Sequence, residues 1–568
     1  MSIDFHGTKN KVTTSSRSFE NALPSELWTL VGKHLHDCLP LRRLVNVCRS
    51  FRRIFIPILY ARRCIYLSRG DNNLRENLPA SLPYTKELLL VIYNNIDDDD
   101  DEEGLGRNRN DEMINYISRI IEMIPHLQSL RIYEGETVTS RSERLSILDS
   151  PNLQRAVNMC WSLKHMTVSL KGDIMTQDNP SSFSIVPSYL TSLELRGLDG
   201  DKSELAKNLA KLLARCSNLK SLELFVTDEE FKKAPGPTHV LVPKVQAQHC
   251  KSLLEDICDS FKVHCKASPL RLTRLRLGHG LFLWKSQAQK SSNFLDQLTD
   301  LSVLRDLEFF NGFTKVLDGD NWHLKLTRIN FELLVNCTSL QRLCVTRLNG
   351  HLKSWLNGGA GASIHELQIL GNPVWNDPIL AEFNTLNVPK LSKLLVRDHI
   401  PEEHWAPTQD GNKYGGRLRP DLTASEITVL DRLPHHGTQL SKLSLCLDFE
   451  DHWPRFSSHL SEMKMLTQLQ IESQHWFPVS FFKTPIGELP REEAINYFKT
   501  QIFLLCPSLR YLEIFTHSKW TMDGVSGTEP RVLKYKEALT VDFFSTVGPG
   551  SIFETSTLPK LETPHVVF

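Results

Sequence analysis

A single motif, Leu-x-x-Leu-x-apolar, recurs along most of this chain and constrains its fold more than any other feature. In each copy the last three positions alternate apolar and polar side chains, which is the period of a β-strand. One such strand buries little surface alone, so neighbouring copies must stack to share a core. Twelve copies occur, and they begin at Leu127, Leu163, Leu190, Leu219, Leu272, Leu304, Leu340, Ile364, Leu391, Leu440, Leu466 and Leu509.

The spacing of the copies is irregular but falls around that of leucine-rich repeats. Steps of 27 and 26 residues, as from the second copy to the third and from the tenth to the eleventh, lie in the range of such repeats. The step from Leu219 to Leu272 spans 53 residues and that from Leu391 to Leu440 spans 49. Each long step indicates either a degenerate unit or an insertion. One further candidate copy precedes the series, from Thr85 to Leu90.

Segments between the copies have helical periodicity. Apolar residues three and four apart occur between residues 205 and 213, and again between 114 and 124, where Pro125 ends the pattern. The order helix, turn, strand therefore predicts a curved α/β solenoid, with parallel strands inside and helices outside.

Cysteine lies three residues before the leading leucine in four copies, at Cys160, Cys216, Cys337 and Cys506. We expect each to lie where a helix ends and the chain turns into its strand, a corner that suits a small apolar side chain. Metal binding is the alternative, but one cysteine per repeat would leave the thiols far apart. The twelve cysteines include no Cys-x-x-Cys pair, so we expect reduced thiols and a cytoplasmic or nuclear location.

Charge and hydropathy exclude two classes of partner. Lys plus Arg and Asp plus Glu both total 66, and a general nucleic-acid binder needs a basic excess. No stretch approaches 18 consecutive apolar residues, so we expect no membrane span.

Residues 19–67 differ in kind from the repeats. Pro24 suits the opening turn of a helix, and we expect one apolar face on it, made of Leu27, Leu30, Val31 and Leu35. After a break at 36–40, a second helix is expected to carry Leu41, Leu44, Val45 and Cys48, with Phe51, Ile54 and Phe55 continuing the pattern. A unit of this size cannot bury so many apolar side chains, and such a surface normally finds a partner.

Read in order, these residues resemble the F-box motif. The resemblance is carried by Leu23-Pro24-x-Glu26-Leu27, Val31, Leu35, Leu41, Leu44, Val47-Cys48-Arg49 and Phe51. Residues 57–67 resemble an extension common in fungal members. Phe51 stands where the family usually has tryptophan, and the loop between the helices is about one residue longer. The repeats resemble the cysteine-containing leucine-rich repeats of F-box proteins over about two thirds of the chain.

The resemblance implies a function and a partner. F-box modules bind the Skp-type adaptor of cullin–RING ubiquitin ligases, and the distal repeats hold a target protein. Carried over residue by residue, it assigns an adaptor-facing or module-core role to Leu23, Pro24, Leu27, Val31, Leu35, Leu41, Val47 and Phe51. The alternative is a helical cap that seals the end of a leucine-rich-repeat scaffold without engaging a ligase.

The concave side of the predicted arch is the expected target surface. In each strand the residue between the two apolar positions, and the one after them, should face that side. The second of these columns contains several aromatics and arginines, which often anchor interfaces. We therefore predict that Arg196, Phe225 and Phe310 contact the target, unless loops or insertions cover them.

No motif for catalysis, metal binding or phosphate binding is present, so we expect neither an enzyme nor a cofactor. We divide the chain into a disordered segment (1–18), the helical module (19–67), the solenoid (80–515) and a cap or tail (516–568). Within the solenoid, the acidic run 97–103 is expected to be a solvated loop, with a basic partner as the alternative.

Overall fold

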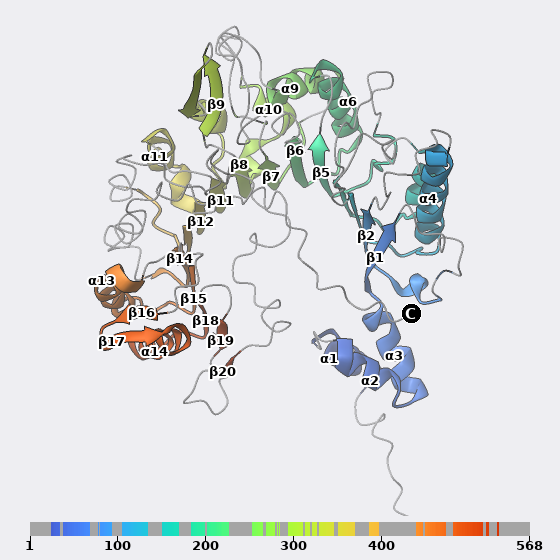
Figure 1. Cartoon of the computed structure of the whole chain (residues 1–568). Helices are drawn as coiled ribbons and strands as arrows, with labels where there is room; N and C mark the ends of the chain where they lie inside the picture. The colour runs from blue at the N-terminus through green and yellow to red at the C-terminus, as the bar shows by residue number, and fades with distance from the viewer. Residues whose placement is uncertain are drawn as a thin grey trace, which may run out of the picture.

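The computed structural model shows an arch with a small helical module below one end (Figure 1). It describes residues 24–34, 38–68, 78, 80–93, 105–134, 150–169, 183–198, 202–226, 253–264, 269–278, 281, 283, 293–309, 313–318, 321–326, 329–345, 350–369, 386–396, 439–446, 449–472, 481–514, 518–521 and 531–532. Strands line the inner side of the arch and helices lie outside, so the predicted α/β architecture is confirmed.

One long sheet runs through the whole arch. Among the described residues, fourteen of its strands run parallel and follow one another in chain order, apart from two short hairpins that leave the sheet. The parallel strands are β1 (Arg62–Ser68), β2 (Glu87–Tyr93), β3 (Ser129–Glu134), β4 (His165–Ser169), β5 (Ser192–Leu198), β6 (Ser221–Val226), β7 (Arg274–Leu277), β8 (Asp306–Phe309), β11 (Arg342–Val345), β12 (Glu366–Ile369), β13 (Lys393–Val396), β14 (Lys442–Cys446), β15 (Gln468–Glu472) and β18 (Tyr511–Ile514).

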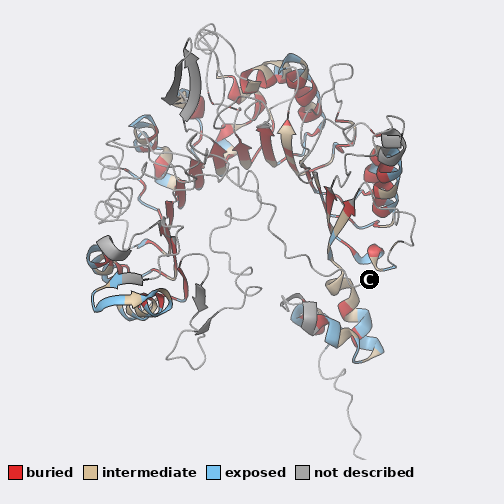
Figure 2. Cartoon of the chain, viewed as in Figure 1, coloured by how far each residue is buried: buried red, intermediate tan, exposed pale blue. Residues whose placement is uncertain are grey.

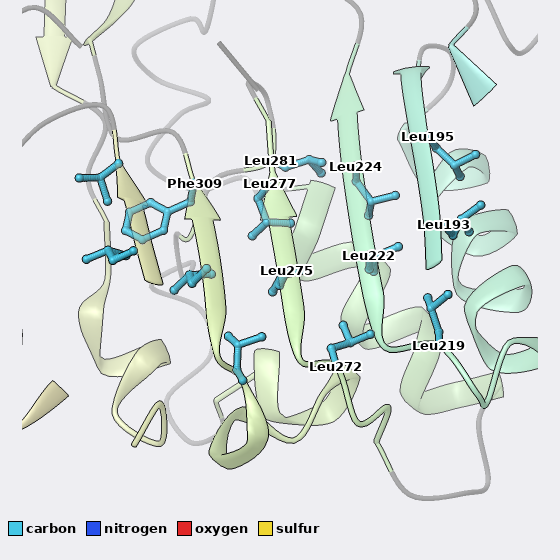
Figure 3. Close-up of a cluster of buried hydrophobic side chains, with 14 of the residues drawn as sticks. Leu193, Leu195, Leu219, Leu222, Leu224, Leu272, Leu275, Leu277, Leu281 and Phe309 are labelled. Carbon is cyan, nitrogen blue, oxygen red and sulfur yellow. The ribbon is translucent and has the colours of Figure 1, made fainter. Parts of the chain in front are cut away.

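All twelve motif copies form strands of this sheet, and the candidate copy at 85–90 forms β2. The second core position of each copy, a leucine in all copies but the one with Met166, pairs in register with that of the next, as Leu222 does with Leu275 and Leu275 with Leu307. These leucines are fully buried and stack in rows from strand to strand (Figure 3). β6 pairs directly with β7, and β13 with β14. The long steps are therefore insertions and not missed strands.

Helices cover the outer face of the sheet. In α6 the buried residues follow helical spacing from Leu205 to Leu213, as predicted. Pro151 opens α5, and the Ser150 hydroxyl accepts a hydrogen bond from the Leu153 amide at 3.3 Å. The outer helices are α4 (Leu105–Glu122), α5 (Pro151–Met159), α6 (Lys202–Arg215), α9 (Leu253–His264), α10 (Leu295–Leu298), α11 (Gly350–Asn357), α13 (Phe449–Glu462) and α14 (Arg491–Leu505), with short 3-10 turns η3 (Leu82–Tyr84), η5 (Leu301–Val303), η6 (Phe331–Leu334) and η7 (Ala360–Ser363). None of the described helices is both long and apolar enough to cross a membrane.

The four repeat cysteines lie at the predicted corners between helix and strand. All are buried, and three of the thiols donate to backbone carbonyls of the preceding repeat. The Cys160 sulfur, for example, lies 3.8 Å from the Ile124 oxygen. Burial raises the pKa of Cys160 and Cys216 to about 11. These neutral, enclosed thiols act as corner packing.

The two ends of the sheet are finished differently. β19 (Ser518–Thr521) pairs antiparallel with β18, and β20 (Arg531–Val532) pairs antiparallel with β19. At the other end, β1 follows directly after the helical module and begins the sheet. The sheet thus starts at Arg62, inside the range 19–67 that we assigned to the module, and continues past residue 515.

Two hairpins leave the main sheet. β9 (Phe313–Asp318) pairs with β10 (Asn321–Leu326) between β8 and β11, and β16 (Phe481–Thr484) pairs with β17 (Gly487–Pro490) before α14. The ranges 1–18 and 97–103 lie outside the described residues.

Candidate binding surfaces

The helical module has a small core of its own. Helices α1 (Ser25–His34), α2 (Cys38–Val45) and α3 (Arg49–Leu59) pack around four buried side chains. Among them, the Trp28 and Phe51 rings lie 4.8 Å apart edge to face, and the Phe51 and Phe55 rings 5.4 Å apart. The fourth side chain is Leu41.

A glycine lets α1 approach α3 closely. A Cβ atom at Gly32 would lie 2.7 Å from the Ile58 Cδ1 atom and 2.8 Å from the Phe55 ring. Trp28 and Gly32 are one helical turn apart and both face the core. The buried stripe of α1 is therefore Trp28 and Gly32, which the apolar pattern did not single out.

The second predicted helix is in fact two helices. The chain breaks between Val45 and Arg49, and Cys48 caps α3: its sulfur accepts a hydrogen bond from the Phe51 amide at 3.3 Å. The prediction of one continuous helix was wrong because the periodicity of apolar residues passes through the turn without interruption. Helix α2 also begins at Cys38, within the predicted break.

The predicted apolar face of α1 is on the surface. Leu27, Leu30 and Val31 are 44%, 49% and 38% exposed, and Val47, in the turn before α3, is 64% exposed. At about 100° per residue, Leu27 and Val31 lie roughly a quarter to a third of a turn from the Trp28 and Gly32 stripe, and Leu30 lies roughly half a turn from it. Because the core takes the tryptophan stripe, the aliphatic stripe is left on the surface. Figure 2 shows the general contrast, with mostly buried strands in the arch and many exposed residues in the module.

The structure separates the predicted adaptor residues into two groups. Leu41 and Phe51 belong to the core, whereas Pro24, Leu27, Val31 and Val47 are exposed. Leu23 and Leu35 lie outside the described residues. Leu30 was missing from the predicted set, although its place on the same helical face could have identified it.

The concave face of the arch carries a ladder of alternating charges. Three columns of side chains face this side, one before the first core position of each strand, one between the two core positions and one after them. The first column reads, from β7 to β13, Arg274, Asp306, Arg342, Glu366 and Lys393. Each charge therefore faces an opposite charge on the neighbouring strand.

The distances show that these charges pair with one another. The Arg274 Nε atom lies 2.7 Å from Asp306 Oδ2, and Lys393 Nζ lies 3.2 Å from Glu366 Oε2. Arg342 reaches three carboxylates: Asp306, Glu308 Oε2 at 3.0 Å and Glu366 Oε1 at 3.4 Å. In the second column, Arg276 bridges Glu223 Oε2 at 3.2 Å and Glu308 Oε2 at 3.0 Å.

Burial shifts the pKa values of the charged groups in this ladder. Burial by itself lowers the pKa of Arg342, but its three carboxylate neighbours raise it above the ordinary value, so the guanidinium stays charged. Burial raises the pKa of Glu223, at the β6 end of the ladder, to about 7. The Arg276 guanidinium, which Glu223 shares with Glu308, lowers this pKa, and the nearby Glu194 carboxylate raises it. The ladder contains as many cations as anions and so offers no net charge to a ligand.

Two of the predicted target residues lie together on β5 and β6. The Arg196 guanidinium stacks over the Phe225 ring at 4.4 Å and pairs with Glu194. Phe225 is only 8% exposed and also contacts Gly278, where a Cβ atom would come within 2.6 Å of the ring. Phe310 lies outside the described residues. The Phe225 ring thus lies beneath the Arg196 guanidinium, and the Arg196 side chain is the more exposed of the two.

Comparison with known proteins adds little. No protein-family model matches the chain, and no curated protein matches it significantly. Among solved structures, it matches a chain of the Rad7 and Elc1 complex from yeast, with 13% identity and a TM-score of 0.33, over 86% of this chain and 88% of that one. A likeness this distant carries no inference about function.

Proposed function

We propose that this chain is an F-box substrate receptor of a cullin–RING ubiquitin ligase. In this proposal the module α1–α3 binds a Skp-type adaptor, and the leucine-rich-repeat arch binds a target protein. The chain itself performs no catalysis and needs no cofactor. Ubiquitin transfer would be the work of the assembled ligase.

The observation that carries the proposal is the exposed aliphatic stripe of the module. Leu27, Leu30, Val31 and Val47 remain on the surface although the module has a complete core without them. Each of these side chains is about half exposed, so covering the rest of it contributes on the order of 1 kcal/mol. Several such side chains on one small unit are typical of a docking surface. The F-box resemblance names the partner that would cover them.

The arch suits the role of a rigid spacer and target platform. The charges of its ladder are paired between strands, and its core is continuous from β1 to β18. The proposed target contact includes Arg196, supported by Phe225, with Phe310 as the third predicted member.

Co-purification with a Skp-type adaptor tests the proposal. The informative variant is Leu27→Asp with Val31→Asp, because both side chains are exposed and neither belongs to the core. Val263→Asp with Val335→Asp is the matched control, since these valines are 76% and 67% exposed on the arch. We expect the original chain and the control to retain the adaptor, and the module variant to lose at least about a hundredfold in affinity with an unchanged melting temperature.

A second candidate is a leucine-rich-repeat scaffold whose module only caps the first strand. It is favoured by one observation, the packing of α3 against η3 at the start of the sheet. If the folded original chain fails to retain any Skp-type adaptor, the scaffold replaces the receptor as the better account.

A further inference from the structure

The module and the first strand contain an unusual run of arginines. Between Asp37 and Asp71 the sequence has eight arginines and no aspartate, glutamate or lysine. The whole chain is neutral, with 66 basic and 66 acidic residues, so this stretch is a local concentration of positive charge. An imbalance of this kind concerns partners and association rates more than the fold.

The structure separates these arginines by their partners. Arg62 forms an ion pair with Glu87 at 3.1 Å, and Arg63 lies over the Tyr60 ring at 4.8 Å and donates to the Ser81 hydroxyl. Both therefore help to join β1 to its surroundings. Arg69 lies outside the described residues.

The five remaining arginines are of a different kind. They are all exposed, and within the described part of the chain none of them has an ion pair. They are Arg42, Arg43, Arg49, Arg52 and Arg53.

They lie on two helices of the module that pack against each other. Arg49, Arg52 and Arg53 are spaced as i, i+3 and i+4, so they share a face of α3 away from the buried Phe51 and Phe55. Arg42 and Arg43 lie on α2, which packs against α3. In the charge ladder of the arch, by contrast, Arg276 and Arg342 are buried and paired.

We propose that these five arginines bind an acidic surface of a protein partner and steer it onto the module. A guanidinium has a fixed fork of donors that matches a carboxylate, and the run contains arginine alone. The same small module also exposes the aliphatic Leu27, Leu30, Val31 and Val47, and arginine with apolar side chains is a combination typical of protein interfaces. A surface for single-stranded nucleic acid would instead interleave arginine with exposed aromatic rings.

The inference rests on the proposed function in one respect, that the module binds a protein. It adds the chemistry of that partner, a surface with both apolar and acidic side chains. Charge of this kind raises the association rate more than it slows dissociation.

The test uses the full chain with a labelled oligoglutamate peptide, and with a single-stranded oligonucleotide of equal net charge. The variant carries Arg→Gln at 42, 43, 52 and 53. The control carries Arg→Gln at 119, 155, 271 and 305, which are exposed arginines of the arch. We expect the affinity for the peptide to fall about tenfold in the module variant and less than about twofold in the control. Circular dichroism monitors folding, and the pairs Arg42→Gln with Arg43→Gln and Arg52→Gln with Arg53→Gln are used if the quadruple variant unfolds.

Equal losses in both variants would overturn the inference, as would tighter binding of the oligonucleotide through the same four arginines. A second arm measures association of a Skp-type adaptor between about 50 mM and about 200 mM salt, where screening of surface charge increases. The expected result is a slower, less salt-dependent association in the module variant with unchanged dissociation. If no Skp-type adaptor binds the original chain, the proposed function is refuted. The peptide measurement still tests separately whether the five arginines bind an acidic surface.

Discussion

The module and the arch differ in how completely they bury their apolar side chains and pair their charges. In the arch each strand and helix covers its neighbours, and the apolar core continues from Leu67 to Ile514. On part of the polar face of its sheet, from β6 to β13, basic side chains and carboxylates on adjacent strands also pair with each other. In the module, four buried side chains form the core, and aliphatic and arginine side chains remain on the surface.

This difference indicates where binding energy is available. Charged groups already paired inside a protein must lose those partners before they can bind a ligand, so the centre of the arch is a poor site for an ionic ligand. Exposed aliphatics and unpaired arginines have no such cost. The module, where several such side chains occur together in one small unit, is therefore where we expect a partner to bind.

The largest expected effect comes from breaking the ladder in the arch. Arg342→Met leaves Asp306, Glu308 and Glu366 without their shared guanidinium, and removing one member of a buried ion pair costs about 3–5 kcal/mol. Chemical denaturation should therefore show a much less stable arch. Arg305→Met, at an exposed position, is the control. Equal stabilities of the two variants would mean that the ladder is not structural.

The two leucine environments can be compared directly. Leu275→Ala removes a fully buried side chain, which should lower the free energy of unfolding by about 2–5 kcal/mol. Leu27→Ala in the module, where the side chain is 44% exposed, should change it by less than about 0.5 kcal/mol. Thermal denaturation of both variants checks this contrast. A large loss at Leu27 would show that it belongs to a core.

Glu223 should make the stability of the arch depend on pH. Its pKa is raised to about 7 in the folded chain, from an ordinary value near 4.5. The folded state therefore holds the proton on Glu223 more tightly than the unfolded state. The contribution of this protonation to the free energy of unfolding is fully present below about pH 4.5 and is lost as pH rises through about 7. Across this range the free energy of unfolding should fall by on the order of 3 kcal/mol.

Denaturation of the original chain and Glu223→Gln between about pH 4.5 and pH 8 tests this effect. The original chain should lose stability relative to the variant as pH rises. Parallel curves for the two proteins would contradict the raised pKa.

The smallest expected effect concerns the module alone. Gly32→Val places side-chain carbons against Phe55 and Ile58, and overpacking of this kind costs about 1–3 kcal/mol. Leu30→Val on the exposed face of the same helix is the control. Hydrogen exchange should increase in α1 and α3 of the Gly32 variant only, with β6 to β8 unchanged. Faster exchange in those strands would show that module and arch unfold together.

The arch could be predicted from the sequence because its signal is periodic. The twelve copies give the strands, their parallel order and their register, since the second leucine of each must meet that of the next. The charge ladder was also readable in principle: once the register is known, Arg274, Asp306, Arg342, Glu366 and Lys393 alternate in sign along one column.

The module was predicted less well, because a short helix with apolar residues on two stripes has no unique inner face. The sequence determined that α1 is apolar, whereas only the packing of Trp28 and Gly32 against α3 decided that Leu27, Leu30 and Val31 would be on the surface. Likewise, the sequence placed Arg196 and Phe225 in one column, but only the fold showed that Phe225 lies beneath the guanidinium. Periodicity specifies which residues share a face. Which face is buried depends on the neighbours that pack against it, and those come from elsewhere in the chain.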